Sequence, residues 1–275
     1  MITDISKALI VLVLVGLVFG VLLALFIGLF GVEEDEKKKK IRAALPGINC
    51  GACGYKGCND YAEALCKGTC KANLCVPGAE ATANELGEIL GVEVEAKERM
   101  VAFVHCNGVC DAAVQKAVYD GVSSCKACAL SFGGTKLCSY GCLGCGDCAK
   151  VCSAGAICIE DGIARIDIGR CAGCGLCVAE CPKNIISLIP ETAATAVYCN
   201  SKDKGADARK ACKNACIGCK KCEKACPEQA ISVVNNCAVI DYSKCTGCGV
   251  CVEGCPTGCL KTLAHTIATT DNGSN

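Results

Sequence analysis

Tryptophan is absent from this 275-residue sequence, and other aromatic side chains are few, with five Phe and six Tyr. Small domains with so few large apolar side chains are hard to stabilise by packing alone. The formal net charge is zero, so bulk charge gives no argument for a nucleic-acid partner. The source of stability must therefore lie in the residues that are abundant.

Cysteine is the abundant residue, with 32 in the chain. Such a density is typical of either a disulfide scaffold or metal centres. Bonds to an inorganic core would replace the missing aromatic packing, because metal binding is coupled to folding.

An unbroken apolar run of 23 residues extends from Ala8 to Phe30. As a helix it would be about 34 Å long, which matches a hydrocarbon core of roughly 30 Å and predicts one transmembrane helix. A cleaved signal peptide is disfavoured, because only Lys7 gives the front a positive charge and no A-x-A-like site follows. Basic residues at 37–40 and Arg42 predict a single-pass cell-membrane protein, N-terminus outside and the rest cytoplasmic. Cytoplasmic thiols stay reduced, which favours metal over disulfides.

Four cysteine runs have the C-x2-C-x2-C-x3-C spacing of bacterial ferredoxins. The tight spacing lets three thiolates face one iron-sulfur cube, while the fourth cysteine ligates the other cluster of the pair. Proline follows three of the runs, and Ser153 replaces it after the first. The runs are Cys142, Cys145, Cys148 and Cys152; Cys171, Cys174, Cys177 and Cys181; Cys216, Cys219, Cys222 and Cys226; and Cys245, Cys248, Cys251 and Cys255.

The spacing between runs indicates a duplication. The first and second runs start 29 residues apart, as do the third and fourth, and the two pairs are offset by 74. The chain is therefore predicted to hold two tandem two-cluster modules, each with a hairpin, over 156–166 and 231–240. Crossed ligation predicts four sets: Cys142, Cys145, Cys148 and Cys181; Cys171, Cys174, Cys177 and Cys152; Cys216, Cys219, Cys222 and Cys255; and Cys245, Cys248, Cys251 and Cys226.

A fifth set lies nearer the N-terminus, at Cys50, Cys53, Cys58 and Cys75, and a helix is expected from Asn59. Four thiolates also suit zinc, so spacing alone leaves both metals open. Beside four ferredoxin runs, iron is favoured. The sequence thus predicts at least four 4Fe-4S clusters, and five or more when this set is counted.

Twelve cysteines remain. Six are candidate ligands of one or more further clusters: Cys106, Cys110, Cys125, Cys138, Cys199 and Cys212. Six have no clear partner and are interpreted as buried small apolar residues: Cys66, Cys70, Cys128, Cys158, Cys237 and Cys259. The histidines are unassigned; His105 adjoins Cys106, although a core or surface role is favoured over ligation.

The predicted fold class is α+β: one N-terminal transmembrane helix, a small Fe-S domain and two tandem two-cluster ferredoxin modules. The expected boundaries are 1–32 for the anchor, 33–95 for the small Fe-S domain, 96–137 for a connecting region, 138–192 for the first module, 193–265 for the second module and 266–275 for a tail.

A basic segment from Lys202 to Lys224 adjoins the third run, with eight Lys or Arg against three acidic residues. It would attract an acidic partner and raise the association rate, or it is simply a solvated face. We expect electrons to enter at the C-terminal module and to leave near the anchor.

The apolar anchor, the block LPGINCGACGYKGC with Cys75 downstream, GGTKLCSYGCLGCGDC and the doubled modules together resemble the B subunit of the Rnf complex, in its longer, cysteine-rich form. Related sequences carry an apolar residue at Cys145, which leaves open whether Cys138 or Cys145 ligates the first cube.

The resemblance implies an electron carrier that takes electrons from soluble ferredoxin, within a complex that reduces NAD and translocates Na+ or H+. Flavins, NAD binding and ion translocation would belong to other subunits of the complex, and the chain has no G-x-G-x-x-G opening a helix after a strand and no P-loop. The alternatives are a polyferredoxin of another membrane oxidoreductase and a zinc-rich interaction module without redox function.

Overall fold

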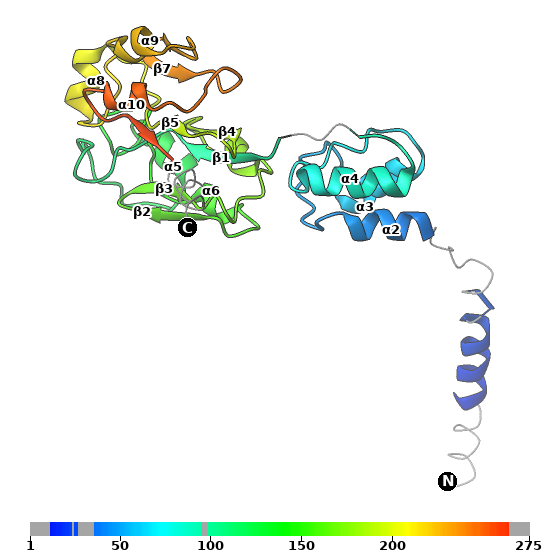
Figure 1. Cartoon of the computed structure of the whole chain (residues 1–275). Coiled ribbons are helices and arrows are strands. Elements are labelled where there is room, and N and C mark those ends of the chain that lie inside the picture. The colour runs from blue at the N-terminus through cyan, green and yellow to red at the C-terminus, as the bar shows by residue number, and fades with distance from the viewer. Residues whose placement is uncertain (1–11, 24, 27–35, 95–97, 264–275) are drawn as a thin grey trace, which may run out of the picture. The chain divides into compact units, whose positions relative to one another are not determined.

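The computed structural model describes residues 12–23, 25–26, 36–94 and 98–263. Two compact units divide the chain, residues 1–40 and residues 41–275 (Figure 1). The prediction for His265 and the predicted tail lie outside the described residues.

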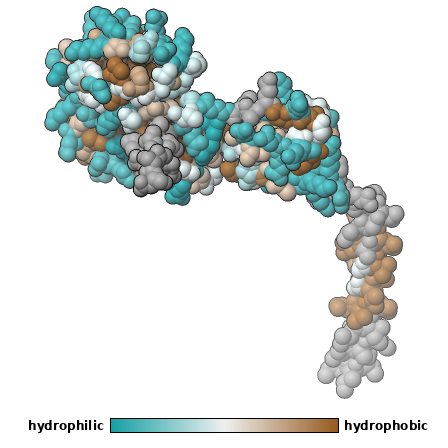
Figure 2. Space-filling model, in the orientation of Figure 1, coloured by the Kyte–Doolittle hydropathy of each residue, from teal (hydrophilic) through white to brown (hydrophobic). Residues whose placement is uncertain are grey.

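The predicted transmembrane helix is wrong. Among the described residues, no helix is long and apolar enough to cross a membrane. Residues 12–23 are helical and mostly apolar, as the brown surface in Figure 2 indicates. That length corresponds to about 18 Å, well short of the roughly 30 Å hydrocarbon core. The remainder of the predicted span, apart from residues 25–26, lies outside the described residues, and the single-pass topology built on it loses its support.

The small domain contains α2 (Glu36–Ala44), α3 (Cys58–Cys66) and α4 (Ala79–Leu90). Its core gathers Ile41, Tyr61, Leu65 and Leu86, all almost fully buried. The helix expected from residue 59 is confirmed as α3. The Tyr61 hydroxyl donates to the Lys71 carbonyl at 2.8 Å and accepts the Leu74 amide at 3.2 Å, so it ties α3 to the loop that leads to Cys75.

Both predicted hairpins are present. Strand β2 (Ile157–Glu160) pairs with β3 (Ile163–Ile166), and β6 (Ile231–Val234) pairs with β7 (Cys237–Ile240). The two-residue turns have positive φ at both positions, Asp161-Gly162 in one and Asn235-Asn236 in the other. Such turns match the right-handed twist of the flanking strands, which explains why these dipeptides form tight hairpins.

Two further strand pairs bind each module to the chain that precedes it. Strand β1 (Met100–Val104) pairs with β4 (Ile186–Pro190), and β5 (Thr195–Val197) pairs with β8 (Leu260–Thr262), all antiparallel. The strand β1 lies within the region expected only to connect domains. Because β1 and β5 each add a strand to the end of one module, the residues just after them are placed beside the clusters' ligands.

The helices between these strands are short. They are α5 (Cys125–Leu130), α6 (Asp147–Lys150), α7 (Leu176–Glu180), α8 (Gly205–Ala211), α9 (Lys221–Ala225) and α10 (Val250–Glu253). The residue before α6, α7, α9 and α10 is left-handed in each case, and it is Lys220 rather than glycine only before α9. In the helix after this turn, the third cysteine is buried in the first three runs and half-buried, as Cys251, in the fourth.

Candidate iron-sulfur cluster sites

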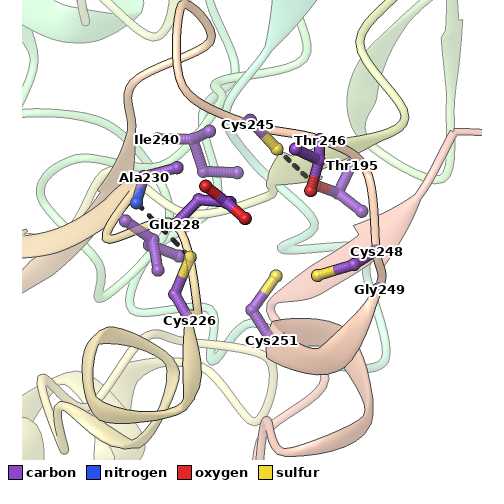
Figure 3. A pocket seen from close by; sticks show the side chains of 11 residues that line it. Thr195, Cys226, Glu228, Ala230, Ile240, Cys245, Thr246, Cys248, Gly249 and Cys251 are labelled. Carbon is purple, nitrogen blue, oxygen red and sulfur yellow. Dashed lines mark hydrogen bonds between the residues drawn. The ribbon is translucent and has the colours of Figure 1, made fainter.

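The second module encloses a cavity around one complete predicted set. Cys226, Cys245, Cys248 and Cys251 line it, together with Thr195 and Ile240, and their sulfurs surround a common space (Figure 3). Three of these cysteines come from the loop before α10 and from α10 itself, and Cys226 comes from the end of α9. This space, the Cys226 cavity, therefore has the crossed arrangement expected of a two-cluster ferredoxin.

A second cavity in this module, the Cys216 cavity, gathers the other predicted set. It is lined by Cys216, Cys219, Cys222 and Cys255, with Cys259 as a fifth cysteine. The Cys259 sulfur lies 3.6 Å from that of Cys255. Its hydrogen bond is the main reason that the pKa of Cys255 is lowered to about 4, so Cys259 contacts a predicted ligand position directly.

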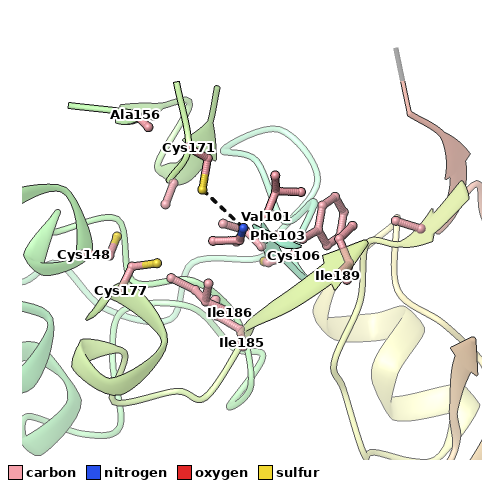
Figure 4. Packing of buried hydrophobic residues seen from close by; sticks show 14 of the residues in the cluster. Val101, Phe103, Cys106, Cys148, Ala156, Cys171, Cys177, Ile185, Ile186 and Ile189 are labelled. Atoms are coloured by element: carbon pink, nitrogen blue, oxygen red, sulfur yellow. Dashed lines mark hydrogen bonds between the residues drawn. The ribbon is translucent and has the colours of Figure 1, made fainter. Parts of the chain in front are cut away.

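The first module brings together Cys152, Cys171, Cys174 and Cys177, the set that corresponds to the Cys226 cavity. Burial raises the pKa of Cys177 to about 11, and the other three thiols of the set lie close enough to raise it further. Figure 4 shows Cys171 and Cys177 packed with the buried apolar side chains of β1 and β4. The amide of Ala102, in β1, donates to the Cys171 sulfur at 3.3 Å.

The remaining set of the first module differs from the prediction in one member. The Cys142 cavity is lined by Cys142, Cys148 and Cys181, as expected, but its fourth cysteine is Cys125 and not Cys145. The Cys145 thiol lies instead against Cys128 and Cys125, outside the residues that line the cavity. Cys138 does not line it either. The sequence had placed Cys125 only among candidates for a further cluster.

Backbone amides point at the sulfurs in both modules. Ala156 donates to Cys152 and Ala230 donates to Cys226, each at 3.3 Å, and these two pairs are related by the 74-residue repeat. Amide hydrogen bonds to cysteine sulfur stabilise the thiolate and tune the potential of an iron-sulfur cluster. The repetition indicates that the fold, and not only the spacing, prepares these positions as ligands.

The small domain gathers Cys50, Cys53, Cys58 and Cys75. Burial raises the pKa of Cys75, and the other three thiols contribute to the shift. Cys70 lies beside this set and shares a hydrogen bond with the Tyr55 hydroxyl. The four predicted ligands are therefore close together, with Cys70 as a neighbouring thiol that the sequence did not single out.

A further cavity, the Cys106 cavity, is lined by four of the cysteines named as candidates for an additional cluster, Cys106, Cys138, Cys199 and Cys212. Burial raises the pKa of Cys138 to about 11, with a further contribution from the other three thiols. The other candidates lie elsewhere: Cys110 is exposed, and Cys125 belongs to the Cys142 cavity. His105 also lines the Cys106 cavity, but its two ring nitrogens are hydrogen-bonded to the Val197 carbonyl and the Ser187 hydroxyl.

The cysteines without assigned partners divide into two kinds. Cys128, Cys237 and Cys259 are buried, as expected, whereas Cys158 is exposed and Cys66 and Cys70 are half-buried. Cys237 and Cys259 are more than small apolar residues, because both form hydrogen bonds with Cys216. The interpretation as buried residues is thus confirmed for Cys128, Cys237 and Cys259 and wrong for the other three. It also missed the hydrogen bonds of Cys237 and Cys259.

The shape of the quartets fits an inorganic cube. The four cavities are similar in size, and each is lined by at least four cysteines. Within the described residues, no three Cys, His, Asp or Glu side chains converge closely enough to hold a single metal ion. Four thiolates around one zinc ion lie about 2.3 Å from it. The quartets enclose a volume rather than a point, as ligands at the corners of a cube do.

Known protein families match the same segments. A family described as Fe-S cluster matches residues 45–77. Two families described as 4Fe-4S dicluster domain match, one at residues 141–185 and 215–259 and the other at 170–230. The two matches of the first dicluster family repeat the duplication that the cysteine spacing predicts.

Three relatives are similar over most of the chain. The B subunit of the Na(+)-translocating ferredoxin:NAD(+) oxidoreductase complex of Acetobacterium woodii is 43% identical over 231 residues, 84% of this chain and 69% of the relative. The B subunit of the proton-translocating ferredoxin:NAD(+) oxidoreductase complex of Clostridium ljungdahlii is 43% identical, over 86% of this chain and 84% of the relative. The B subunit of the ion-translocating oxidoreductase complex of Methanosarcina acetivorans is 37% identical, over 85% and 89%. The duplicated dicluster modules and these similarities together place the chain in the family of B subunits of Rnf-type ion-translocating ferredoxin:NAD oxidoreductase complexes.

Proposed function

We propose that this chain carries electrons between soluble ferredoxin and downstream redox subunits of a complex that couples NAD reduction to Na+ or H+ translocation. The observation that carries the proposal is the enclosure of shared cavities by cysteine quartets in both modules. When bound, 4Fe-4S clusters supply one-electron oxidation and reduction at these positions. The chain itself holds the clusters, excludes water and tunes their potentials.

Three of the proposed ligand sets line cavities, and the other two are grouped by the proximity of their thiols. They keep the crossed sets of the sequence prediction with one exchange, Cys125 for Cys145 in the Cys142 cavity. The sets are Cys50, Cys53, Cys58 and Cys75; Cys125, Cys142, Cys148 and Cys181; Cys152, Cys171, Cys174 and Cys177; Cys216, Cys219, Cys222 and Cys255; and Cys226, Cys245, Cys248 and Cys251.

The second module is the proposed site of electron uptake. Cys219 and Cys248 are exposed, whereas their counterparts in the first module, Cys145 and Cys174, are half-buried. A partner can therefore approach the cavities of the second module more closely, and tunnelling rates fall steeply with distance. Lys220 and Lys221, which follow Cys219 directly, are exposed and would attract an acidic ferredoxin.

The test is an iron and acid-labile sulfide count on anaerobically purified protein, combined with EPR after reduction by ferredoxin. We expect about 4 iron and 4 sulfide for each loaded set, and a reducible cubane signal that appears with reduced ferredoxin. A folded, colourless protein that contains zinc instead of iron would overturn the proposal. Iron that ferredoxin does not reduce would refute the choice of electron donor alone.

A further inference from the structure

We propose that Cys106, Cys138, Cys199 and Cys212 bind an additional 4Fe-4S cluster that joins the two ferredoxin modules. The inference deepens the proposed function. It rests on one part of that proposal, which is that the chain binds iron-sulfur clusters. None of the four cysteines belongs to a C-x2-C-x2-C-x3-C run. The ligand set follows from how the two modules pack.

Each module contributes two of the four cysteines, from matching places. Cys106 follows β1 by two residues, and Cys199 follows β5 by two residues. Cys138 precedes the first run by four residues, and Cys212 precedes the third run by four residues. The strands β1 and β5 are in turn the ones that close the first and second modules by pairing with β4 and β8. The Cys106 cavity therefore lies at the meeting of two equivalent half-sites.

The backbone prepares all four sulfurs in the same way. The Gly108 amide donates to the Cys106 sulfur at 3.4 Å, and the Ser201 amide donates to the Cys199 sulfur at 3.5 Å. Cys138 and Cys212 likewise accept the amide two residues further along the chain. The same pattern occurs at Cys171, the first cysteine of the second run and within the match to the dicluster domain, where the Gly173 amide donates at 3.4 Å. Four convergent thiols with this local geometry are positioned as cluster ligands rather than as core residues.

Gly108 lies against two of the four thiols of this cavity. A side chain at Gly108 would meet the Ala113 methyl group at 3.4 Å and the sulfurs of Cys106 and Cys212 at 3.5 and 3.8 Å. The cavity is similar in size to the cavities of the ferredoxin sets. Its lining also includes the rings of Tyr140 and Tyr198.

A buried cation also faces this cavity. Lys136 is 3% exposed and lines the cavity. Its ammonium donates to the carbonyls of Gly108 and Gly162 at 2.8 and 2.9 Å, and it forms no ion pair with a carboxylate among the residues that the structure describes. A buried charge is costly unless an opposite charge offsets it. Four thiolates around an iron-sulfur cube carry a net negative charge, which would offset that of Lys136.

The Cys106 cavity also lies next to one cavity of each module. The Cys106 sulfur accepts the amide of Cys142, a ligand position of the Cys142 cavity, at 3.4 Å. On the other side, the Cys237 thiol donates to the Cys199 carbonyl at 3.2 Å, and its sulfur lies beside that of Cys216. The additional cluster would accept one electron from a reduced neighbour in the second module and pass it to the first, with no bond made or broken.

The test compares two double variants of the full chain, C106A/C199A and C110S/C158S, both made anaerobically with the iron-sulfur assembly machinery. The second removes two exposed thiols that line none of the cavities, so it is matched in the number of cysteines lost. We expect C106A/C199A to lose about 4 iron and 4 sulfide per chain relative to the wild type, and C110S/C158S to keep the wild-type content. Equal iron content in both variants would overturn the proposal.

A ligand exchange covers the case in which C106A/C199A does not accumulate. Serine can ligate iron through oxygen, so C212S is expected to retain iron but to change the EPR signal and potential of one cluster while the others stay as in the wild type. Unchanged spectra of C212S, or zinc at this site by elemental analysis, would refute the additional cluster. A wild-type chain that contains no iron would instead refute the proposed function itself.

Discussion

The two ferredoxin modules share one topology but differ in what lies behind their cluster sites. At two positions related by the 74-residue repeat, Ile163 and Ile185 of the first module are replaced by Cys237 and Cys259 in the second. All four side chains are buried, with at most 2% exposed. The exchange therefore keeps the packing and adds two thiols. The repeat determines where the ligands lie, while single buried residues can set the reduction potential of each cluster.

The added thiols touch ligand positions. Cys237 and Cys259 both form hydrogen bonds with Cys216, and Cys259 also contacts Cys255. These contacts lower the pKa of Cys216 and Cys255, because a thiol proton stabilises a neighbouring thiolate, and each thiol donates its one proton to one acceptor at a time. A donor to a cluster's sulfur stabilises the reduced, more negative cluster in the same way and raises its potential. The cluster of the Cys216 cavity is thus expected to be easier to reduce than that of the Cys142 cavity.

The largest expected effect is a difference in iron content between variants of Cys145 and Cys219. These two cysteines occupy the same place in the repeat. Cys219 lines the Cys216 cavity, whereas Cys145 does not line the Cys142 cavity. We expect Cys219→Ala to lose or degrade one cluster, with a fall of up to about 4 iron per chain, and Cys145→Ala to retain the full iron content. Iron and sulfide analysis of the two variants measures this difference.

Cys125→Ala completes that comparison, because Cys125 lines the Cys142 cavity in place of Cys145. It should lose as much iron as Cys219→Ala does. Iron loss in Cys145→Ala with none in Cys125→Ala would show that both modules use the same four positions of the repeat.

The next effect concerns potential. Replacing Cys259 by Ile makes the second module match the first at this position and removes one donor to Cys255. One net hydrogen bond of about 1 kcal/mol corresponds to roughly 40 mV for a one-electron couple, so we expect a fall of up to that size. EPR-monitored redox titration measures the change.

The reverse exchange, Ile185→Cys, serves as the control for Cys259→Ile. It should raise the potential of the cluster in the Cys142 cavity, if the new thiol reaches a ligand as Cys259 does. Equal potentials in wild type and Cys259→Ile would mean that this thiol has no part in tuning.

A smaller effect concerns the exposed lysines beside Cys219. We expect K220E/K221E to slow reduction by ferredoxin several-fold at low ionic strength, because attraction of an acidic partner accelerates association. The difference should shrink as salt is added. Stopped-flow reduction over a range of ionic strengths measures it, and K56E/K71E, which changes two exposed lysines of the small domain, is the matched control. A flat salt response would remove the docking role of the basic segment.

The smallest effect concerns the backbone at Lys220. This residue has φ of 60°, whereas its counterpart Gly146 has φ of 81° at the same turn. A left-handed conformation costs a residue with a side chain about 1–2 kcal/mol. Lys220→Gly should therefore stabilise the second module by about 1 kcal/mol, and Gly146→Lys should destabilise the first by a similar amount. The rate of cluster loss in guanidinium measures both, and a faster loss in Lys220→Gly would contradict the expectation.

Much of this architecture could be predicted from the sequence, because it is local. Three cysteines spaced by two residues lie on one loop, and Cys216, Cys219 and Cys222 line one cavity as their spacing predicts. The first run, in which Cys145 turns away, shows the limit of this rule. The Asp161-Gly162 and Asn235-Asn236 turns likewise fix hairpins through their own preference for positive φ. The predicted membrane helix was wrong. An apolar run in the sequence shows only that a helix there could span a membrane, and the helix among the described residues is too short to do so.

By itself, the sequence determined that this chain holds paired cysteine sites of ferredoxin type in two repeated modules, since ligand spacing and turn residues act over a few positions. Only the tertiary structure decided which distant thiols complete them. Cys125 reaches the Cys142 cavity because the Asp147 carboxylate holds the Ser124 hydroxyl and the Lys126 amide on either side of it. Cys106 and Cys199 reach the Cys106 cavity as the chain leaves β1 and β5, which pair with β4 and β8. Such contacts depend on packing between segments far apart in the chain. No spacing rule contains that information, because Cys145 and Cys219 are related by the same 74-residue offset and yet only Cys219 lines a cavity of its module.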